Sequence, residues 1–247
     1  MDLGISGRTA LVTGASTGLG LACARALAAE GVRVALASRS VEKLAAAAAT
    51  IEGDPVVLTV DLSEPASIDA LVDDATAALG QVDILVANGG GPPPGNFAST
   101  EVDAYQAALQ LNLLSMVALT KAFVPPMQER GWGRVVAVTS AAVRQPMANL
   151  ILSNTARSGL TAFLKTTALE VAGDGVIVNT VQPGLHATDR LAQLYDDLDG
   201  VADSVPTRRL GDPGDFGRIV AFLCSESAKS IIGASVPVDS GAVKGLQ

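Results

Sequence analysis

The chain has few of the residues that build metal sites and disulfide frameworks. Its 247 residues include one histidine and two cysteines, Cys23 and Cys224, which lie far apart and outside any Cys-x-x-Cys pattern. We therefore expect neither a metal site nor a disulfide framework, and we expect both thiols to be buried and reduced. Aromatic residues make up only 3% of the chain, so its core should consist mainly of alanine, valine and leucine.

Positive charge is also scarce. The chain has 17 lysines and arginines against 25 acidic residues, a formal net charge of −8, and no basic tract. Nucleic acids and anionic membranes attract clustered lysine and arginine, so we expect neither as a partner. The first expected strand begins at Arg8, which leaves no room for a signal peptide. No apolar run approaches the ~18 residues that span a membrane, and we expect a cytoplasmic protein.

What the chain does contain is a regular alternation of β-forming runs and helical segments. With 49% hydrophobic residues, it is large enough to bury one sizeable core. This alternation predicts a doubly wound α/β fold, a seven-stranded parallel sheet of Rossmann-like type, in a single domain over residues 1–247. Ligands bind such sheets at the carboxyl ends of the strands. The expected strands are residues 8–12, 32–38, 56–60, 82–88, 134–139, 176–181 and 234–238.

The first strand leads into the helix that follows through a glycine-rich turn, Thr13 to Gly20, with the sequence Thr-Gly-Ala-Ser-Thr-Gly-Leu-Gly. Glycine permits a tight turn and a close approach of the backbone to a ligand. The free N–H groups at the start of a helix attract a pyrophosphate. The turn therefore predicts a dinucleotide site. A second biased segment, Gly89 to Gly95, is expected to be a functional loop.

Two long helices are expected, over residues 101–124, ending at Pro125 and Pro126, and over residues 150–172. Ser40 and Asp212 are expected to cap further helices. Residues 185–207 follow the sixth strand and should form a substrate lid, whose apolar inner face is built from one set of side chains at helical spacing. These are Leu191, Leu194, Tyr195 and Leu198.

The spacing of the glycine turn resembles the Thr-Gly-x-x-x-Gly-x-Gly pattern of the short-chain dehydrogenase/reductase family, in particular its 3-oxoacyl-ACP reductases. Three further stretches are similar to motifs of that family in the same order: Ala87-Asn88-Gly89-Gly90, Pro183-Gly184 with Thr188, and Val238-Asp239-Ser240-Gly241. The resemblance covers almost the whole chain. It implies the fold expected above, a nicotinamide cofactor, and contact of Asp61 with adenine.

The end of the second strand distinguishes NADP from NAD. An acidic residue there would bind the ribose hydroxyls of NAD, but the chain has Ser38-Arg39-Ser40, and the planar fork of Arg39 suits a 2′-phosphate. We therefore expect NADP. The expected cofactor-binding residues are Gly14, Ser16, Thr17, Gly18, Leu19, Gly20, Ser38, Arg39, Asp61, Leu62, Asn88, Gly89, Arg157, Pro183, Gly184 and Thr188.

The expected catalytic residues depart from the family pattern. The resemblance assigns roles to Asn112 and Ser140, but Ser153 and Arg157 occupy the positions of the family's Tyr-x-x-x-Lys motif. Spacing by four residues keeps this pair on one helix face. Its acidity is lost, because an aliphatic hydroxyl is a much poorer acid than phenol and arginine holds its proton too tightly to relay it as lysine can. His186 is the candidate for an alternative proton route.

Three hypotheses follow. The first is an NADP(H)-dependent oxidoreductase that acts on the carbonyl or alcohol of a small hydrophobic substrate, in which Ser140 and Ser153 orient the oxygen. The second keeps NADP as a scaffold for a nonredox isomerase, dehydratase or cyclase. The third is a noncatalytic NADP-binding subunit. Arg144 could meet an anionic group of the substrate or lie on the surface. The resemblance also implies a homodimer or homotetramer.

Overall fold

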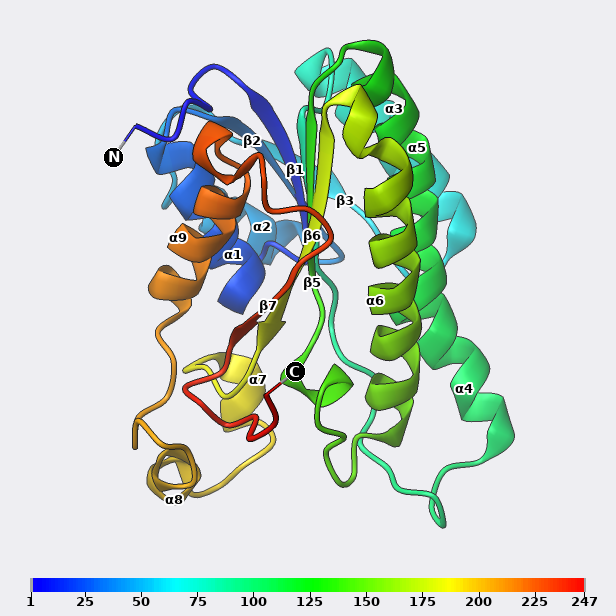
Figure 1. The fold of residues 1–247 in the computed structure, drawn as a ribbon, viewed down its shortest axis with the longest axis vertical. Coiled ribbons are helices and arrows are strands. Elements are labelled where there is room, and N and C mark those ends of the chain that lie inside the picture. The colour runs from blue at the N-terminus through cyan, green and yellow to red at the C-terminus, as the bar shows by residue number, and fades with distance from the viewer. Residues whose placement is uncertain (1, 247) are drawn as a thin grey trace.

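The computed structural model describes residues 2–246 and confirms the predicted sheet. Seven parallel strands form one sheet in the order β3-β2-β1-β4-β5-β6-β7 (Figure 1). The order reverses between β1 and β4, which is the point where doubly wound folds bind ligands. The strands are β1 (Thr9–Thr13), β2 (Arg33–Ser38), β3 (Val56–Thr59), β4 (Ile84–Ala87), β5 (Gly133–Val138), β6 (Val176–Pro183) and β7 (Ser235–Val238).

Helices cover both faces of the sheet, as Figure 1 shows. One face carries α1 (Gly18–Ala29), α2 (Val41–Ala48) and α9 (Pro213–Leu223). The other carries α3 (Pro65–Leu79), α4 (Val102–Leu109), α5 (Ser115–Glu129) and α6 (Ile151–Val171). Short elements complete the fold: η1 (Gln110–Leu114), η2 (Ala141–Val143), η3 (Ala172–Asp174), α7 (Asp189–Ala192), α8 (Leu198–Asp203) and η4 (Glu226–Ala228).

The core consists of two hydrophobic layers, one on each side of the sheet. In β1, Ala10 and Val12 face the α1 and α9 layer, whereas Leu11 faces the α5 and α6 layer. All five residues of this strand are buried, because a parallel sheet between two helical layers has no solvent face. Both cysteines are free and fully buried, as predicted.

Both predicted helix caps are present, whereas one predicted helix end is not. Ser40 accepts a hydrogen bond from the Lys43 N–H, and Asp212 accepts one from the Asp215 N–H. The prediction that a long helix stops at Pro125 and Pro126 was wrong, because α5 continues through both prolines to Glu129. Proline in a helix interior costs about 3 kcal/mol. The fully buried Met127 that follows offsets this cost by packing into the core.

One helix is long and apolar on average, although polar residues interrupt it and no uninterrupted apolar run approaches the length of a membrane span. Elements α4, η1 and α5 run together as one helix, Val102–Glu129, whose 28 residues are long and apolar enough to cross a membrane by length and composition. In the folded domain, 44% of its most apolar window is buried. The inner side of α5 packs on the sheet, so the apolar character of this helix serves the core.

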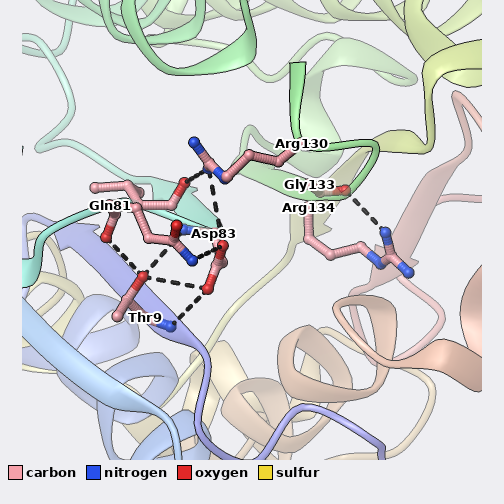
Figure 2. Close-up of polar contacts among 7 residues, drawn as sticks. Thr9, Gln81, Asp83, Arg130, Gly133 and Arg134 are labelled. Atoms are coloured by element: carbon pink, nitrogen blue, oxygen red, sulfur yellow. Dashed lines mark hydrogen bonds and ion pairs between the residues drawn. The ribbon is translucent and has the colours of Figure 1, made fainter. Parts of the chain in front are cut away.

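A polar network ties the amino ends of the central strands together, at the end of the sheet opposite the glycine turn (Figure 2). The buried carboxylate of Asp83 accepts hydrogen bonds from the Thr9 N–H at 3.2 Å and from Gln81 Nε2 at 3.0 Å. Arg130 adds an ion pair at 3.7 Å. The network satisfies a buried charge and fixes the register of β1 against the start of β4.

A second arginine at this end is buried and paired. Arg134 is 3% exposed, and its Nη2 lies 3.1 Å from Glu226 Oε1. The indole of Trp132 lies between two guanidinium groups, 4.3 Å from that of Arg134 and 3.9 Å from that of Arg8. The indole Nε1 also donates to Glu226 at 2.6 Å. The charge of Arg134 is thus compensated by a carboxylate and an aromatic face.

Candidate functional site

A cleft of about 340 Å³ opens at the carboxyl ends of β1, β4, β5 and β6. The cleft brings together segments that are far apart in the sequence: the glycine turn, the loop after β4, the end of β5, one face of α6 and the lid. Of the expected site residues, it is lined by Gly14, Thr17, Gly18, Leu19, Asn88, Gly89, Ser140, Ser153, Arg157, Pro183, Gly184, His186 and Thr188.

The glycine turn needs glycine for two separate reasons. Gly14 and Gly18 have φ values of +59° and +57°, in the left-handed region that glycine adopts without strain. At Gly20 the reason is close packing, because a Cβ atom there would lie 2.2 Å from the Gly14 carbonyl oxygen. Asn88 fastens the turn to the end of β4, since its Nδ2 lies 3.3 Å from the carbonyl oxygens of both Thr13 and Gly14.

The start of α1 fits the pyrophosphate of a dinucleotide. Thr17 caps this twelve-residue helix without a side-chain hydrogen bond to the first-turn N–H groups. These donors, together with the positive end of the helix dipole, lie beside Gly18 at the edge of the cleft. The methyl carbon of Thr188 lies 3.6 Å from the position of a Cβ atom on Gly18, which places the lid over the turn.

The end of β2 contains the residues expected to distinguish NADP from NAD. Ser38 has a buried hydroxyl without a hydrogen-bonding partner within residues 2–246, and the Arg39 side chain that follows is exposed. An orphaned hydroxyl beside a free guanidinium fits a phosphate group. Asp61 lies close by. The Asp61 carboxylate accepts a hydrogen bond from the Ser63 hydroxyl, and this bond lowers the pKa of Asp61. The positive charge of Arg39 lowers it by a smaller amount.

Some expected cofactor residues stand outside the cleft. Ser16 and Gly20 are absent from its lining, Gly20 packs against the Gly14 carbonyl oxygen, and Leu62 lies 3.4 Å from the position of a Cβ atom on Gly89. With Ser38, Arg39 and Asp61 they extend the site along the strand ends beyond β1. Asn88 and Gly89 line the cleft directly.

Two serine hydroxyls converge on the cleft from different elements. Ser140 follows β5, and its Oγ accepts a hydrogen bond from the Ala142 N–H at 3.1 Å while its O–H stays free to donate. Ser153 lies on the first turn of α6 and is 8% exposed. Its hydroxyl has no hydrogen-bonding partner within residues 2–246. Both hydroxyls are therefore free to bind an oxygen atom of a ligand.

Arg157 lies one turn beyond Ser153 on α6. It is 8% exposed, and burial lowers the pKa of its guanidinium to about 10. Its Nη1 donates to the Val138 carbonyl oxygen at 2.8 Å and its Nη2 to the Gly89 carbonyl oxygen at 3.2 Å. Arg157 thus joins the ends of β5 and β4 under the cleft. The structure confirms that Ser153 and Arg157 share one helix face.

Asn112 acts on the cleft from a distance. It lies in η1, a single turn of π-helix between α4 and α5, and such turns are frequent at functional sites. Its Nδ2 donates to the Gly90 carbonyl oxygen at 2.7 Å, and this hydrogen bond holds the glycine-rich loop. Its buried Oδ1 has no hydrogen-bonding partner among the described residues. Asn112 does not line the cleft, and its contact with the cleft runs through the Gly90 loop.

His186 is a poor proton donor in this structure. It is 4% exposed, and its ring packs edge-on against Phe216 with 5.2 Å between ring centroids. Its Nδ1 lies 3.3 Å from the Gly184 carbonyl oxygen, and a Cβ atom on Gly211 would lie 2.7 Å from Nε2. Burial lowers the pKa of His186, so the ring is neutral at pH 7. Phe216 packs against the ring, and His186 also lines the cleft.

One expectation for the substrate region needs correction. The guanidinium of Arg144, for which the sequence left a substrate contact or a surface position open, donates to the Gln182 side chain and to the Ser235 carbonyl oxygen across β6 and β7. The lid divides into α7 and α8, so Leu198 lies outside the cleft lining whereas Leu191, Leu194 and Tyr195 belong to it. Asp197 breaks the expected continuous face by capping α8.

Sequence reasoning missed part of the apolar wall. Met147 and Leu150 line the cleft from the segment between η2 and α6, and Val138 and Thr139 line it from the end of β5. Val138 and Thr139 could have been found, because they precede Ser140 on a strand expected to end at the site. Met147 and Leu150 carry no motif, since an apolar residue in a loop shows its contacts only in three dimensions.

Comparisons with known proteins agree on one family. Residues 14–243 match the family model described as enoyl-(acyl carrier protein) reductase. The chain is 35% identical to dehydrogenase/reductase SDR family member 4 of Sus scrofa, over 98% of this chain and 89% of that protein. It is 33% identical to the 3-oxoacyl-[acyl-carrier-protein] reductase FabG of Salmonella typhimurium, over 97% of this chain and 98% of that one.

Solved structures give the same result. The crystal structure of L-sorbose reductase from Gluconobacter frateurii, complexed with NADPH and L-sorbose, is 33% identical in sequence and superposes with a TM-score of 0.94 over 100% of both chains. The sheet order, the glycine turn, the positions of Ser140 and Asn112, and these relatives lead to one conclusion: the chain belongs to the short-chain dehydrogenase/reductase family of oxidoreductases.

Proposed function

We propose that this protein is an NADPH-dependent reductase that acts on the carbonyl of a small hydrophobic substrate, with Ser153 and Arg157 in place of the usual tyrosine and lysine. One observation carries the proposal: the hydroxyls of Ser140 and Ser153 and the guanidinium of Arg157 line the same cleft as the glycine turn. The NADPH bound to the L-sorbose reductase supports the choice of cofactor.

The cofactor would lie along the carboxyl ends of the strands. Gly14 and Gly18, with the uncapped start of α1, would hold the pyrophosphate, and Ser38 and Arg39 would hold the 2′-phosphate. When bound, NADPH supplies the hydride. The chain's own residues then need only to hold the carbonyl carbon in place and stabilise its oxygen.

The protein's own side chains would act mainly on the carbonyl oxygen of the substrate. Ser140 and Ser153 would donate hydrogen bonds to the carbonyl oxygen, and the nearby charge of Arg157 would stabilise the negative charge that develops there. Neither hydroxyl is a strong acid. Because His186 is packed against Phe216 and neutral at pH 7, we propose that the proton comes from water in the cleft.

The missing phenol has a measurable cost. General acid catalysis contributes about 10² to 10⁴ in rate, or about 3 to 5 kcal/mol of barrier. We expect the double variant Ser153→Tyr with Arg157→Lys to oxidise NADPH about 10² times faster than wild type with the same carbonyl compound. The panel would include 3-oxoacyl thioesters, diketones, quinones and cyclic ketones, with the absorbance of NADPH as the readout.

A matched control tests whether a tyrosine acts only when its phenol lies in the cleft. Ser158 is exposed on the same helix, so Ser158→Tyr adds an identical side chain outside the cleft and should leave the rate unchanged. The proposed reductase activity is wrong if wild type and double variant both bind NADPH and neither oxidises it with any carbonyl compound in the panel.

A second candidate function follows from the same departure. Without a strong acid, the cleft could use bound NADP as a scaffold for isomerisation, dehydration or cyclisation. The free hydroxyls and the buried cation suit such a role, because they stabilise a negatively charged oxygen without redox chemistry. Product formation without any change in the NADPH absorbance would identify this function.

We further propose that the protein is a homo-oligomer assembled through α5 and α6. Leu114 of η1 and Leu169 of α6 are 49% and 68% exposed on this helical layer, which leaves apolar surface for a partner subunit to cover. Light scattering after size-exclusion chromatography would report the mass. Leu169→Glu should shift it to that of a monomer, and a monomeric wild type would exclude the proposal.

A further inference from the structure

Two large apolar side chains at the mouth of the cleft are exposed to water. Leu194 is 40% exposed and Tyr195 is 45% exposed. Among the exposed large hydrophobic residues within residues 2–246, these two alone line the cleft. Neighbouring exposed apolar side chains at a binding cleft are typical of a surface that a ligand covers. Leu194 and Tyr195 therefore indicate where part of the substrate lies.

These two side chains continue an apolar stripe that begins inside the cleft. Leu191 of α7 also lines the cleft but is only 7% exposed. Its carbonyl oxygen accepts hydrogen bonds from the N–H groups of Leu194 at 3.0 Å and of Tyr195 at 3.1 Å. This turn places the three side chains on one helical face. The stripe thus leads from the interior of the cleft to the solvent.

The inner end of the cleft is closed by packed residues. Its floor lies at the end of β5 and on the first turns of α6, where the lining residues are all buried: Val138, Thr139, Ser153 and Arg157. Ser153 supplies one of the two hydroxyls proposed to bind the substrate oxygen. Because protein interiors are close-packed, a substrate with its oxygen at this floor can extend only toward the mouth.

A fixed segment completes the apolar passage from the floor to the mouth. Met147 and Leu150 line the cleft from the segment between η2 and α6. The Met147 carbonyl oxygen accepts a hydrogen bond from Asn154 Nδ2 at 3.0 Å. The Ile151 N–H donates to the Gly95 carbonyl oxygen at 3.2 Å. These bonds tie the segment to α6 and to the loop after β4, so this wall is held against moving aside for a branch of the substrate.

We propose that Leu191, Leu194 and Tyr195 form a binding site for an unbranched hydrocarbon chain, so that the substrate is a straight-chain compound with its reacting carbonyl near one end. The identity of the substrate rests on the proposed function, whereas the hydrocarbon site itself does not. The carbonyl oxygen binds at the floor, and the chain covers the exposed lid residues. None of these three residues is assigned to the cofactor, so the chain and NADPH bind together.

Binding to the hydrocarbon site can be tested without turnover. Butanamide, octanamide and 2-propylpentanamide, a branched isomer of octanamide, are titrated by isothermal titration calorimetry into protein saturated with NADP⁺. We expect each added methylene group of octanamide to tighten binding about two- to fourfold relative to butanamide, because it leaves water for the apolar stripe. The branched isomer should bind at least about tenfold more weakly than octanamide, because its second branch overfills the passage.

A double variant locates the site. Leu194→Ser with Tyr195→Ser should lower the ratio of octanamide affinity to butanamide affinity at least about tenfold. Val41→Ser is the control, because Val41 is exposed on α2 and lies outside the cleft lining, and that ratio should stay within about twofold of wild type. Thermal unfolding verifies that each variant is folded.

Several results would exclude the hydrocarbon site. Wild type could bind octanamide no more tightly than butanamide, bind octanamide and its branched isomer equally, or bind no amide. The double variant could keep the wild-type ratio of the two affinities. Each of these results would show that no hydrocarbon chain binds over Leu194 and Tyr195.

Turnover separates this inference from the proposed function. NADPH oxidation is compared for octan-2-one and octan-4-one, isomers with the same number of carbon atoms. We expect a preference of at least about tenfold in kcat/KM for octan-2-one, and this preference should fall in the double variant. Equal or reversed preference would overturn the inference and leave the reductase intact. Tighter binding of octanamide than of its isomer, without reduction of any carbonyl compound, would support the hydrocarbon site and overturn the reductase.

Discussion

Gly20 is the residue whose replacement should damage the cofactor site most directly. A Cβ atom at this position would lie 2.2 Å from the carbonyl oxygen of Gly14 and 2.7 Å from Asn88 Nδ2. Ordinary contacts of a Cβ atom begin near 3.4 Å. Because one of the obstructing atoms belongs to the backbone of the turn, no rotation of a side chain relieves the overlap. Gly20→Ala must therefore push α1 away from the turn.

The loss of stability in Gly20→Ala follows from the contacts that the added methyl group disturbs. Overpacking typically costs about 1 to 3 kcal/mol, and each hydrogen bond of Asn88 to the turn contributes about 0.5 to 1.5 kcal/mol. Replacement of glycine by alanine within a helix raises the free energy of unfolding by about 0.5 to 1 kcal/mol. The net loss is about 1 to 5 kcal/mol, which lowers the Tm of a domain of this size by about 2 to 20 °C.

Thermal unfolding and NADPH titration together test this reasoning. Gly173→Ala is the control, because no atom lies within 4 Å of a Cβ atom there and its φ is not positive, and its Tm should stay within about 2 °C of wild type. Gly20→Ala should also bind NADPH at least about tenfold more weakly. A Gly20→Ala protein with the Tm and NADPH affinity of wild type would refute the role assigned to close packing at the turn.

Three further predictions concern stability and reactivity. Glu226→Ala should lower the free energy of unfolding by about 1.5 to 3 kcal/mol, because it leaves a buried arginine without its carboxylate, whereas Asp215→Ala in an exposed pair should change it by under about 0.5 kcal/mol. Urea unfolding measures both, and equal losses would contradict this difference. Burial lowers the pKa of His186 below 6.5, so the unfolded chain takes up the proton first as the pH falls. Stability should therefore decline below about pH 6.5, and His186→Gln, which removes the only histidine, should decline less between pH 7.5 and 5.5. Burial raises the pKa of Cys23 and of Cys224, so both thiols should react with Ellman's reagent only at the rate of unfolding, and rapid labelling of the native protein would show them to be accessible.

The sequence predicted the fold and the edge of the sheet where the site lies. Buried strands alternate with helices over the whole chain, and this pattern allows few arrangements other than a doubly wound parallel sheet. Capping followed the same local logic at Ser40 and Asp212, where a side-chain oxygen accepts an N–H of its own helix. Such features depend on neighbours in the chain, so the amino-acid order alone specifies them.

The sequence could not predict contacts between distant parts of the chain. Arg144 bonds to β6 and β7, and His186 packs against Phe216 of α9. The prolines of α5 were expected to end the helix, but burial of Met127 outweighs their local preference. In each case tertiary packing decided between alternatives that look equivalent in the sequence.

The pair Ser153 and Arg157 shows both contributions. The sequence by itself determined which residues stand at these positions and their spacing of one helical turn. Only the tertiary structure showed that Arg157 is buried with no carboxylate partner within residues 2–246, while Arg134, with the same side chain, is paired with Glu226. The difference arises because the energy of a charge depends on burial and on nearby opposite charges, and folding alone sets both.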